Sequence, residues 1–301
     1  MKILIINNLA SGQYDTAIYD FIRSAARDGD EICLRNTDGT TPISALIEDA
    51  RTFDRVVAAG GDGTVACVMY ALRYSGIPVL PFPSGTANLL SMNLQNPEEP
   101  HALAALLCDG RILDFDMGEI STENDSRGFA IMAGSGYDAT LMATAAPGKH
   151  ALGSMAYFLA ASVNLLPQRS DIKLTIDGVS YETKGIGIVL VNFSKITAEL
   201  SITHVNQPRD GMLDVVVLKA KSAFDLLPSI FAALLDVDGK FPDRGDALDI
   251  YSGREITVEA DPAFLIEHDG EPTELSTPYT VRVLPAASRL VVSDDAVKLF
   301  E

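Results

Sequence analysis

A glycine-rich segment with one acid, Gly60-Gly61-Asp62-Gly63-Thr64, directly follows the apolar stretch RVVAA. Glycines let a backbone adopt positive φ angles and approach a ligand closely. If a helix begins here, its first N–H groups and its positive dipole end suit a phosphate. An acid in such a loop repels phosphate unless Mg²⁺ or a substrate proton is near, so Asp62 indicates catalysis more than plain binding. The alternatives are weaker: a tight turn with a solvated aspartate, or the common phosphate loop, whose lysine this segment lacks.

A second polar segment, Pro83–Asn88 (PSGTAN), stands between the apolar run IPVLPF and another expected helix. Its Gly85, Thr86 and Asn88 offer backbone and side-chain hydrogen-bonding groups. Successive strand-to-helix loops open on the same edge of a parallel sheet, so this segment is expected beside the first one. Taken alone, the segment is equally consistent with an ordinary helix N-cap.

The surrounding segments alternate between short apolar runs and stretches with helical spacing up to about residue 118. This β-α order predicts a parallel sheet with helices on both faces. The strands are expected at residues 2–7, 31–35, 55–59 and 77–82, and the helices at 14–27, 43–52, 64–74, 86–94 and 101–109.

Beyond residue 118 the pattern changes to many short strands with turn signals, which predicts an antiparallel sandwich or barrel. Strands are expected at 111–120, 129–133, 172–177, 185–191, 212–218, 255–260, 264–269 and 280–284, and apolar helices at 151–166 and 223–235. The tail, residues 286–301, is expected to return to the first domain, because its final strand and helix would otherwise lack support.

Charge and length narrow the function further. The 301 residues suggest two domains, and 41 acidic against 23 basic side chains give a net charge of −18. This charge argues against nucleic acid as a partner, and against strong electrostatic docking on anionic membranes. Three cysteines are too few for a disulfide framework and fit a cytoplasmic protein. The longest apolar stretch is about 13 residues, short of the ~20 that a membrane-spanning helix needs.

Seven segments, in order, resemble the diacylglycerol kinase-like lipid kinases, which include soluble bacterial lipid kinases and sphingosine kinases. They are Gly60–Thr64, Ser84–Asn88, ILDFDMG, AGSGYDA, LGSMAY, DGMLDVVVL and DGE. The resemblance implies a Rossmann-like α/β nucleotide domain over residues 1–118 and an antiparallel β-sandwich, binding lipid and metal, over 119–285. The active site is then expected in the cleft between them. The implied reaction is ATP- and Mg²⁺-dependent phosphorylation of a lipid hydroxyl, on a diacylglycerol-like or sphingoid-like alcohol presented by a membrane.

The same resemblance assigns roles to individual residues. The residues expected at the nucleotide are Asn8, Ser11, Gly60, Gly61, Asp62, Gly63, Thr64, Gly85, Thr86 and Asn88. Asp269 of the DGE segment resembles the family's catalytic base, with Glu271 beside it, and Asp62 is a rival because sphingosine kinases are thought to use that acid. Asp210 resembles a Mg²⁺ ligand, with the backbone carbonyls of Gln207 and Met212 completing the metal site.

Several positions depart from the family pattern. Leu9 and Gln13 replace a proline and a frequent basic residue, and Leu89 stands where the family often has aspartate. Cys67 replaces a common glutamate, and Thr203–Asn206 replaces a glycine-rich approach to the metal loop. These changes bear on the metal and the substrate more than on the phosphate loop.

Two other functions are compatible with the motifs. An NAD-kinase-like phosphotransferase shares GGDGT but is expected to have an Asn-Glu pair where this chain has Thr86-Ala87-Asn88. A non-catalytic nucleotide-binding regulator would not need to keep all four of the acids Asp62, Asp210, Asp269 and Glu271. His268 precedes Asp269 and is a candidate for orienting it. A peripheral membrane location and a homodimer formed through an edge strand are both compatible with the sequence.

Overall fold

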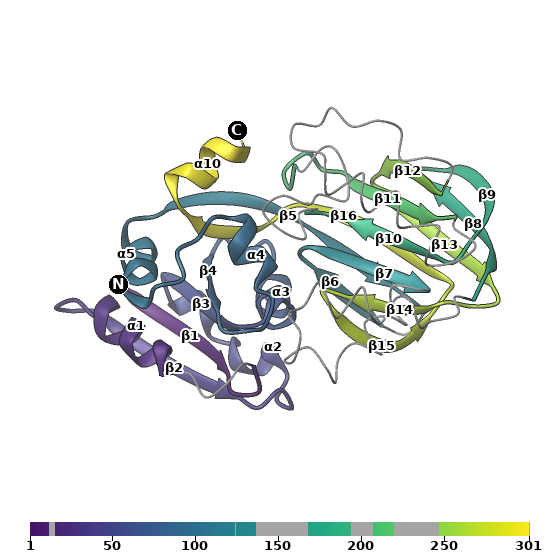
Figure 1. The fold of residues 1–301 in the computed structure, drawn as a ribbon. Helices are drawn as coiled ribbons and strands as arrows, with labels where there is room; N and C mark the ends of the chain where they lie inside the picture. The colour runs from purple at the N-terminus through teal and green to yellow at the C-terminus, as the bar shows by residue number, and fades with distance from the viewer. Residues whose placement is uncertain (12–15, 124, 137–167, 194–206, 220–246, 301) are drawn as a thin grey trace. The chain divides into compact units, whose positions relative to one another are not determined.

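The computed structural model describes residues 1–11, 16–123, 125–136, 168–193, 207–219 and 247–300 (Figure 1). The chain divides into unit 1, Met1–Met117 with Pro285–Glu301, and unit 2, Gly118–Leu284. The helices expected at 151–166 and 223–235 lie outside the described residues. Two long strands, β5 (Arg111–Ser121) and β16 (Tyr279–Val292), supply residues to both units.

Unit 1 contains a parallel sheet with the order β2-β1-β3-β4, extended by the end of β16. Its strands are β1 (Lys2–Asn8), β2 (Glu31–Thr37), β3 (Arg55–Gly60) and β4 (Pro78–Pro83). The middle strands are short apolar runs without polar alternation, as expected when both faces of a sheet are covered. Ile3, Leu4, Ile5 and Ile6 of β1, for example, are fully buried.

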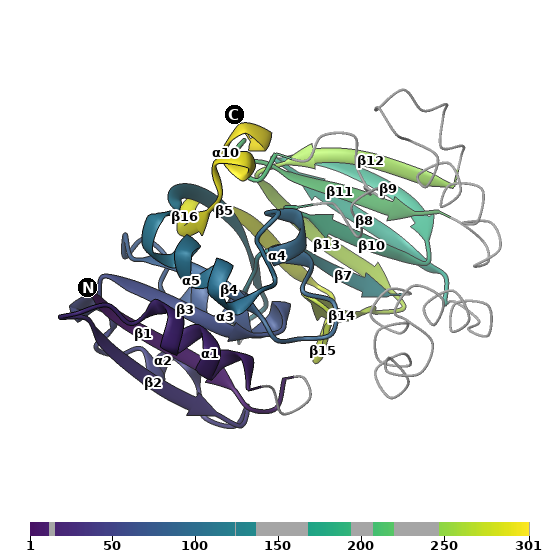
Figure 2. The same cartoon turned by 60° about the vertical axis from the view of Figure 1, so that its left-hand side comes forward.

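Helices cover both faces of this sheet (Figures 1 and 2). They are α1 (Ala17–Ala25), α2 (Ile43–Leu46), α3 (Asp62–Ala71), α4 (Leu89–Asn93), α5 (Pro100–Asp109) and α10 (Asp294–Phe300). Helices α1 and α5 pack over one face, where Phe21 and Leu103 join a core with Ile5 and Val57 of the strands. Helices α2 and α3 lie over the other face. No helix within the described residues combines the length and hydropathy needed to cross a bilayer.

Unit 2 is built from two antiparallel sheets. One sheet contains β6 (Ser126–Phe129), β8 (Ser170–Ile176), β9 (Val179–Gly185) and β13 (Glu255–Asp261) with parts of β5 and β16. The other has the order β12 (Leu248–Gly253), β11 (Leu213–Leu218), β10 (Gly187–Val191), β7 (Met132–Gly136), β14 (Leu265–His268), β15 (Glu271–Ser276). Buried side chains of both sheets share one core, as in a sandwich. The predicted fold class is therefore confirmed.

The helix expected at residues 43–52 is wrong in its extent. Helix α2 ends at Leu46, and a separate 3-10 turn covers Ala50–Thr52. The reason is Arg35, whose guanidinium donates to the Leu46 carbonyl at 2.6 Å and pairs with Asp49. The Ala50 N–H then bonds to Ile47 instead of continuing the helix.

Two strand predictions also need correction, and some strands were not predicted. The strand expected at 129–133 is two strands, β6 and β7, with Ala130 and Ile131 crossing from one sheet to the other. The strand expected at 185–191 is likewise the end of β9 and all of β10. Strands β12 and β15 and all but the last residue of β9 were not predicted, because their alternating polar residues lack a continuous apolar run.

Candidate functional site

Three strand ends bring the predicted nucleotide residues together on one edge of the unit 1 sheet. In the parallel register, Asn7 of β1 lies opposite Ala59 of β3. Gly60, the last residue of β3, lies opposite Pro83, the last residue of β4. The loops that follow these strands therefore begin side by side, as the sequence predicted.

Asn8 connects the loop that follows β1, here called the first loop, to the second loop, which follows β3. Its side-chain Nδ2 donates to the Thr64 hydroxyl at 2.9 Å, and its Oδ1 accepts from the Ala10 N–H at 3.0 Å. Ser11 folds back onto the same residue, because its N–H and its hydroxyl both donate to the Asn8 carbonyl. Asn8 thus fixes the first loop against the start of α3.

The second loop touches the third loop, which follows β4, through glycines. A Cβ added at Gly85 would lie 2.4 Å from the Cα of Gly61, so only glycine allows this approach. The Ser84 N–H donates to the Gly60 carbonyl at 3.3 Å. At Gly60 itself, an added Cβ would meet the Thr64 side chain at 2.5 Å. Gly85 is needed for the close approach of two backbones and Gly60 for the space that the Thr64 side chain takes, and neither has a positive φ angle.

The start of α4 forms a further contact between these loops. Asn88 has a positive φ angle of 50°, and its side chain closes a turn on Gly85, accepting from its N–H and donating to its carbonyl. This turn delays the helix, expected from residue 86, until Leu89. The N–H groups of Leu89 and Leu90 donate to the Asp62 carboxylate, each at 3.0 Å. Thr86 is exposed within the turn.

Helix α3 directs its N-terminus toward this junction of loops. Gly61 is its N-cap, and the helix's own hydrogen bonds begin with the Val65 N–H donating to the Gly61 carbonyl at 3.1 Å. The N–H groups before Val65, including those of Gly63 and Thr64, have no acceptor within the helix itself. A ten-residue helix with such a start is suited to binding phosphate oxygens.

The other predicted catalytic acid, Asp269, lies in unit 2, in the turn between β14 and β15. Its φ angle is +45°, and it is only 9% exposed. Its carboxylate accepts three successive backbone N–H groups, from Ala130 and Ile131 at 2.9 Å and from Met132 at 3.2 Å. Its own N–H donates to the Met132 carbonyl at 2.9 Å. Three N–H donors hold the carboxylate in place and stabilise its negative charge.

Asn192 completes this arrangement, although it was not among the residues predicted for the site. Its side-chain amide donates to the Ala130 carbonyl at 2.8 Å. The N–H groups of Asn192 and Phe193 donate to the Ile131 carbonyl. The crossing between β6 and β7 is thereby bonded on both sides, by Asp269 through its N–H groups and by Asn192 through its carbonyls. The only sequence signal is a buried amide directly after the apolar strand GIVLV.

Two more ionisable side chains are buried beside Asp269. Glu267 is fully buried and accepts from the Gly270 N–H at 3.0 Å. His268 is 6% exposed, and neither ring nitrogen has a hydrogen-bond partner among the described residues. His268 therefore does not orient Asp269 through a hydrogen bond.

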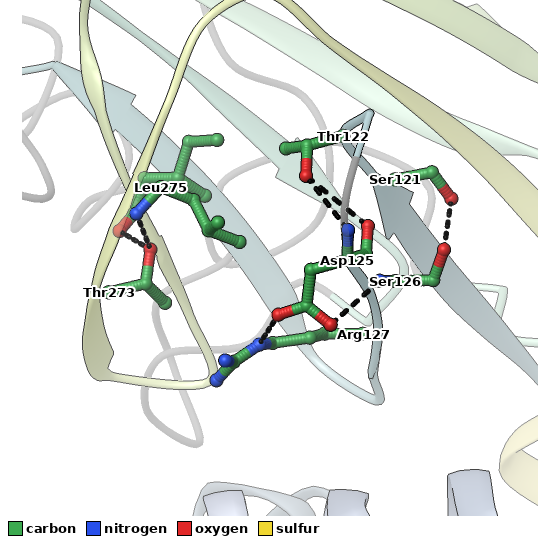
Figure 3. Close-up of polar contacts among 8 residues, drawn as sticks. Ser121, Thr122, Asp125, Ser126, Arg127, Thr273 and Leu275 are labelled. Atoms are coloured by element: carbon green, nitrogen blue, oxygen red, sulfur yellow. Dashed lines mark hydrogen bonds and ion pairs between the residues drawn. The ribbon is translucent and has the colours of Figure 1, made fainter.

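Burial, together with the positive charge of Arg127, lowers the pKa of His268 to about 4. Figure 3 shows Arg127 paired with Asp125 at 2.7 Å, at the edge of β6. The histidine is therefore neutral near pH 7.

The predicted metal residues lie on an exposed turn before β11. The Asp210 carboxylate accepts from the Met212 N–H at 2.9 Å, and the Asp210 N–H donates to the Gln207 carbonyl at 3.4 Å. Across the described part of the chain, no group of three or more His, Cys, Asp or Glu side chains is placed to hold a metal ion. Glu271 contributes backbone to β15, and its side chain is outside the description.

Family models match both parts of the chain. The diacylglycerol kinase catalytic domain matches residues 2–120, and the YegS C-terminal NAD kinase beta sandwich-like domain matches residues 131–292. The chain belongs to the YegS family, with a diacylglycerol kinase catalytic domain before the YegS C-terminal domain. The resemblance drawn from the motifs is thereby confirmed, and membership of this kinase family implies the use of ATP.

Two relatives align with this chain over most of its length. A probable lipid kinase YegS-like protein of Pectobacterium atrosepticum is 29% identical over 297 residues, 95% of this chain and 94% of its own length. The probable lipid kinase YegS of Salmonella arizonae is 28% identical over 284 residues, 89% of this chain and 88% of its own.

Two solved structures share the fold. A diacylglycerol kinase from Bacillus anthracis matches with a TM-score of 0.76 and 20% identity, covering 98% of both chains. An NAD kinase from Archaeoglobus fulgidus in complex with ATP matches with a TM-score of 0.59 and 14% identity, over 99% of this chain and 96% of its own. At these identities the likeness concerns the fold alone.

Proposed function

We propose that this protein transfers the γ-phosphate of ATP to the hydroxyl of a lipid alcohol of the diacylglycerol or sphingoid type. The observation that supports it best is the junction of three strand-to-helix loops in unit 1. Asn8 joins the first loop to the second, and the Gly61–Gly85 contact joins the second to the third. Phosphoryl transfer depends mainly on positioning and charge neutralisation, which such a junction can supply.

In this proposal the N–H groups at the start of α3 hold the phosphate oxygens of ATP. They are fixed before the nucleotide binds, so little reorganisation is needed on binding. The side chains of Asn8 and Asn88 are already used to fix the loops, so their role is to shape the site. Ser11, Thr86 and Gly63 line the same edge, where they can approach the nucleotide.

Asp269 is the proposed acceptor of the proton from the lipid hydroxyl. A general base must be ionised and correctly directed when the hydroxyl arrives. The three amide donors from Ala130 to Met132 provide both conditions. Glu271, two residues further along the turn, is the proposed second acid of this site.

Mg²⁺ is the proposed metal, at the turn that contains Asp210. A carboxylate and the backbone carbonyls of Gln207 and Met212 are oxygen ligands of the kind that this hard cation prefers. They are fewer than the six ligands of Mg²⁺, so waters would complete its shell. Bound there, the ion would supply positive charge that stabilises the turn.

The lipid acceptor implies contact with a membrane surface, so we propose a cytoplasmic protein that binds membranes peripherally. The net charge of −18 makes apolar contact a better basis for this binding than attraction to anionic lipids. A homodimer stays a prediction, for which the exposed edge strand β2 is the candidate surface.

The test is transfer of labelled phosphate from γ-labelled Mg·ATP to acceptors in mixed micelles. The panel contains diacylglycerol, monoacylglycerol, a sphingoid base and a polyprenol, with NAD as a soluble acceptor. We expect one lipid class to be labelled well above the others. Labelling of NAD alone would favour an NAD kinase. Background labelling throughout, from a protein that binds ATP, would favour a nucleotide-binding regulator.

A further inference from the structure

We propose that Asp62 is a positioning residue, whose carboxylate joins the 60–64 loop to the start of α4 and thereby sets the affinity for ATP. The inference rests on the proposed function in taking ATP as the ligand of these loops. It differs from the role of proton acceptor, for which the sequence left Asp62 and Asp269 as rivals.

The geometry at Asp62 is that of a helix cap supplied from another loop. Its Oδ2 accepts the Leu89 N–H and its Oδ1 accepts the Leu90 N–H, both at 3.0 Å. These are the first two residues of α4, whose N–H groups have no acceptor within the helix. A carboxylate is well suited to this position, because it accepts both bonds and its charge complements the helix dipole.

The residue that would ordinarily cap α4 is engaged elsewhere. Asn88 is the N-cap of α4, but its side chain closes the turn on Gly85 with bonds of 2.8 and 2.9 Å. The cap must therefore come from outside the loop, and Asp62 is the side chain that provides it. One consequence is that the two loops cannot move independently of each other.

The same junction contains the closest backbone contact between these loops. Gly85 packs so tightly against Gly61, next to Asp62 in the chain, that a Cβ added at Gly85 would lie 2.4 Å from the Gly61 Cα. Without the Asp62 bonds, the negative charge that attracts the start of α4 is lost, and the loops can separate. The N–H groups of Gly63 and Thr64 would then lose their fixed direction toward the phosphates. Weaker nucleotide binding is the expected result.

Two substitutions and a matched control test this inference. Asp62→Asn keeps one acceptor oxygen, and Asp62→Ala keeps none. The control is Asp177→Asn in unit 2, because the Asp177 carboxylate also accepts two successive backbone N–H groups, from Arg254 and Glu255. It has the same local chemistry but no connection to the nucleotide loops.

The first readout is the dissociation constant for ATP, measured without any lipid acceptor. We expect it to rise by about tenfold or more in Asp62→Ala, as after loss of a charge-assisted hydrogen bond, and by less in Asp62→Asn. The control should stay near the parent. The second readout is amide hydrogen exchange of Leu89 and Leu90, which should become faster in the same order.

The third readout separates the two roles of Asp62. A positioning residue predicts a higher KM for ATP, while kcat at saturating ATP stays within about tenfold of the parent. A proton acceptor predicts that kcat falls equally in Asn and Ala variants, with ATP affinity and exchange at Leu89 and Leu90 unchanged. That second pattern would overturn the inference.

If no lipid is phosphorylated, the proposed function fails, but ATP affinity and exchange still decide the role of Asp62. Unchanged exchange at Leu89 and Leu90 in Asp62→Ala would refute the inference even in an active kinase.

Discussion

Two aspartates, one in each unit, are both held by backbone N–H groups, but they connect different parts of the molecule. Asp62 accepts two bonds from the start of a helix and joins two loops of the predicted nucleotide site. Asp269 accepts three bonds from the crossing between two sheets and joins this crossing to a turn. Asp62 is half-buried, whereas Asp269 is 9% exposed and adjoins the buried Glu267 and His268.

An acid in a sequence motif can therefore hold backbone segments in place, whatever part it takes in the reaction. Because Asp62 lies between the loops proposed to bind the nucleotide, its loss should change ATP binding. Because Asp269 lies in the unit proposed to bind the acceptor, its loss should change turnover. The two residues are thus expected to divide affinity and chemistry between them.

The largest effect is expected for Asp269→Asn. Removal of a general base lowers kcat by about 10²- to 10⁴-fold, while the KM for ATP should hardly change. Steady-state kinetics against a saturating lipid acceptor provide the measurement, with circular dichroism as a check that the variant is folded. A folded variant with nearly parental kcat would show that Asp269 is not the general base. It would also contradict the expectation that Asp62 affects ATP affinity and Asp269 affects turnover.

Gly85→Ala is expected to disrupt the contact between the two loops that Asp62 joins in unit 1. Its Cβ would lie 2.4 Å from the Gly61 Cα, where no flexible side chain can give way. Overpacking of this kind lowers the free energy of unfolding by about 1–3 kcal/mol. The matched variant is Gly61→Ala, whose Cβ would meet the Gly85 Cα at an ordinary 3.6 Å. Urea denaturation should rank Gly85→Ala clearly below Gly61→Ala, and equal stabilities would disprove the close contact.

His268 gives the unit 2 side a dependence on pH. Burial lowers the pKa of His268 to about 4, whereas the unfolded chain takes up this proton near pH 6.5. Between pH 4 and pH 6.5 the unfolded state binds more protons than the folded state. The contribution of His268 to the free energy of unfolding is therefore complete above pH 6.5 and is lost as the pH falls toward 4. The loss from this one group is at most about 3 kcal/mol.

Denaturation curves at several pH values check this, with His268→Leu as the comparison. The variant lacks the group and should show a shallower fall in stability between pH 6.5 and 4. The same slope in both proteins would mean that His268 titrates normally in the folded state.

The smallest effect is expected for Asp210→Ala. The carboxylate lies on an exposed turn and is one of few ligands in the proposed Mg²⁺ site, so its loss should weaken any rise in melting temperature that Mg²⁺ causes. Thermal denaturation in a Mg²⁺ titration measures this, with and without ATP. Coincident titrations for variant and parent without ATP would dismiss Asp210 as a metal ligand.

Much of the fold followed from the sequence because buried strands carry a strong signal. The strands of unit 1 were predicted to within about two residues, since apolar runs such as KILII have no alternative to burial on both faces. Helix α2 was overextended, because the bonds of Arg35 to Leu46 and Asp49 depend on tertiary structure. Ala130 and Ile131, where the chain crosses between the sheets, are apolar, so the sequence pattern predicts a continuous strand there.

The sequence located the loops of the candidate site on one edge of the sheet, but not the contacts within them. Gly60 to Thr64 and Gly85 to Asn88 were selected from glycine placement, and the sheet edge follows from parallel topology. Within the described residues, both aspartates bind backbone N–H groups, which every residue except proline carries, so no sequence pattern marks these contacts. Asn192 was missed for a related reason, since it bonds to backbone carbonyls.

Amide hydrogen exchange of the parent protein with and without Mg·ATP shows whether the loops of unit 1 hold the phosphates of ATP. We expect slower exchange at residues 60–64 and 84–90 when the nucleotide is present. Unchanged exchange in both segments at a nucleotide concentration that saturates binding would contradict this expectation.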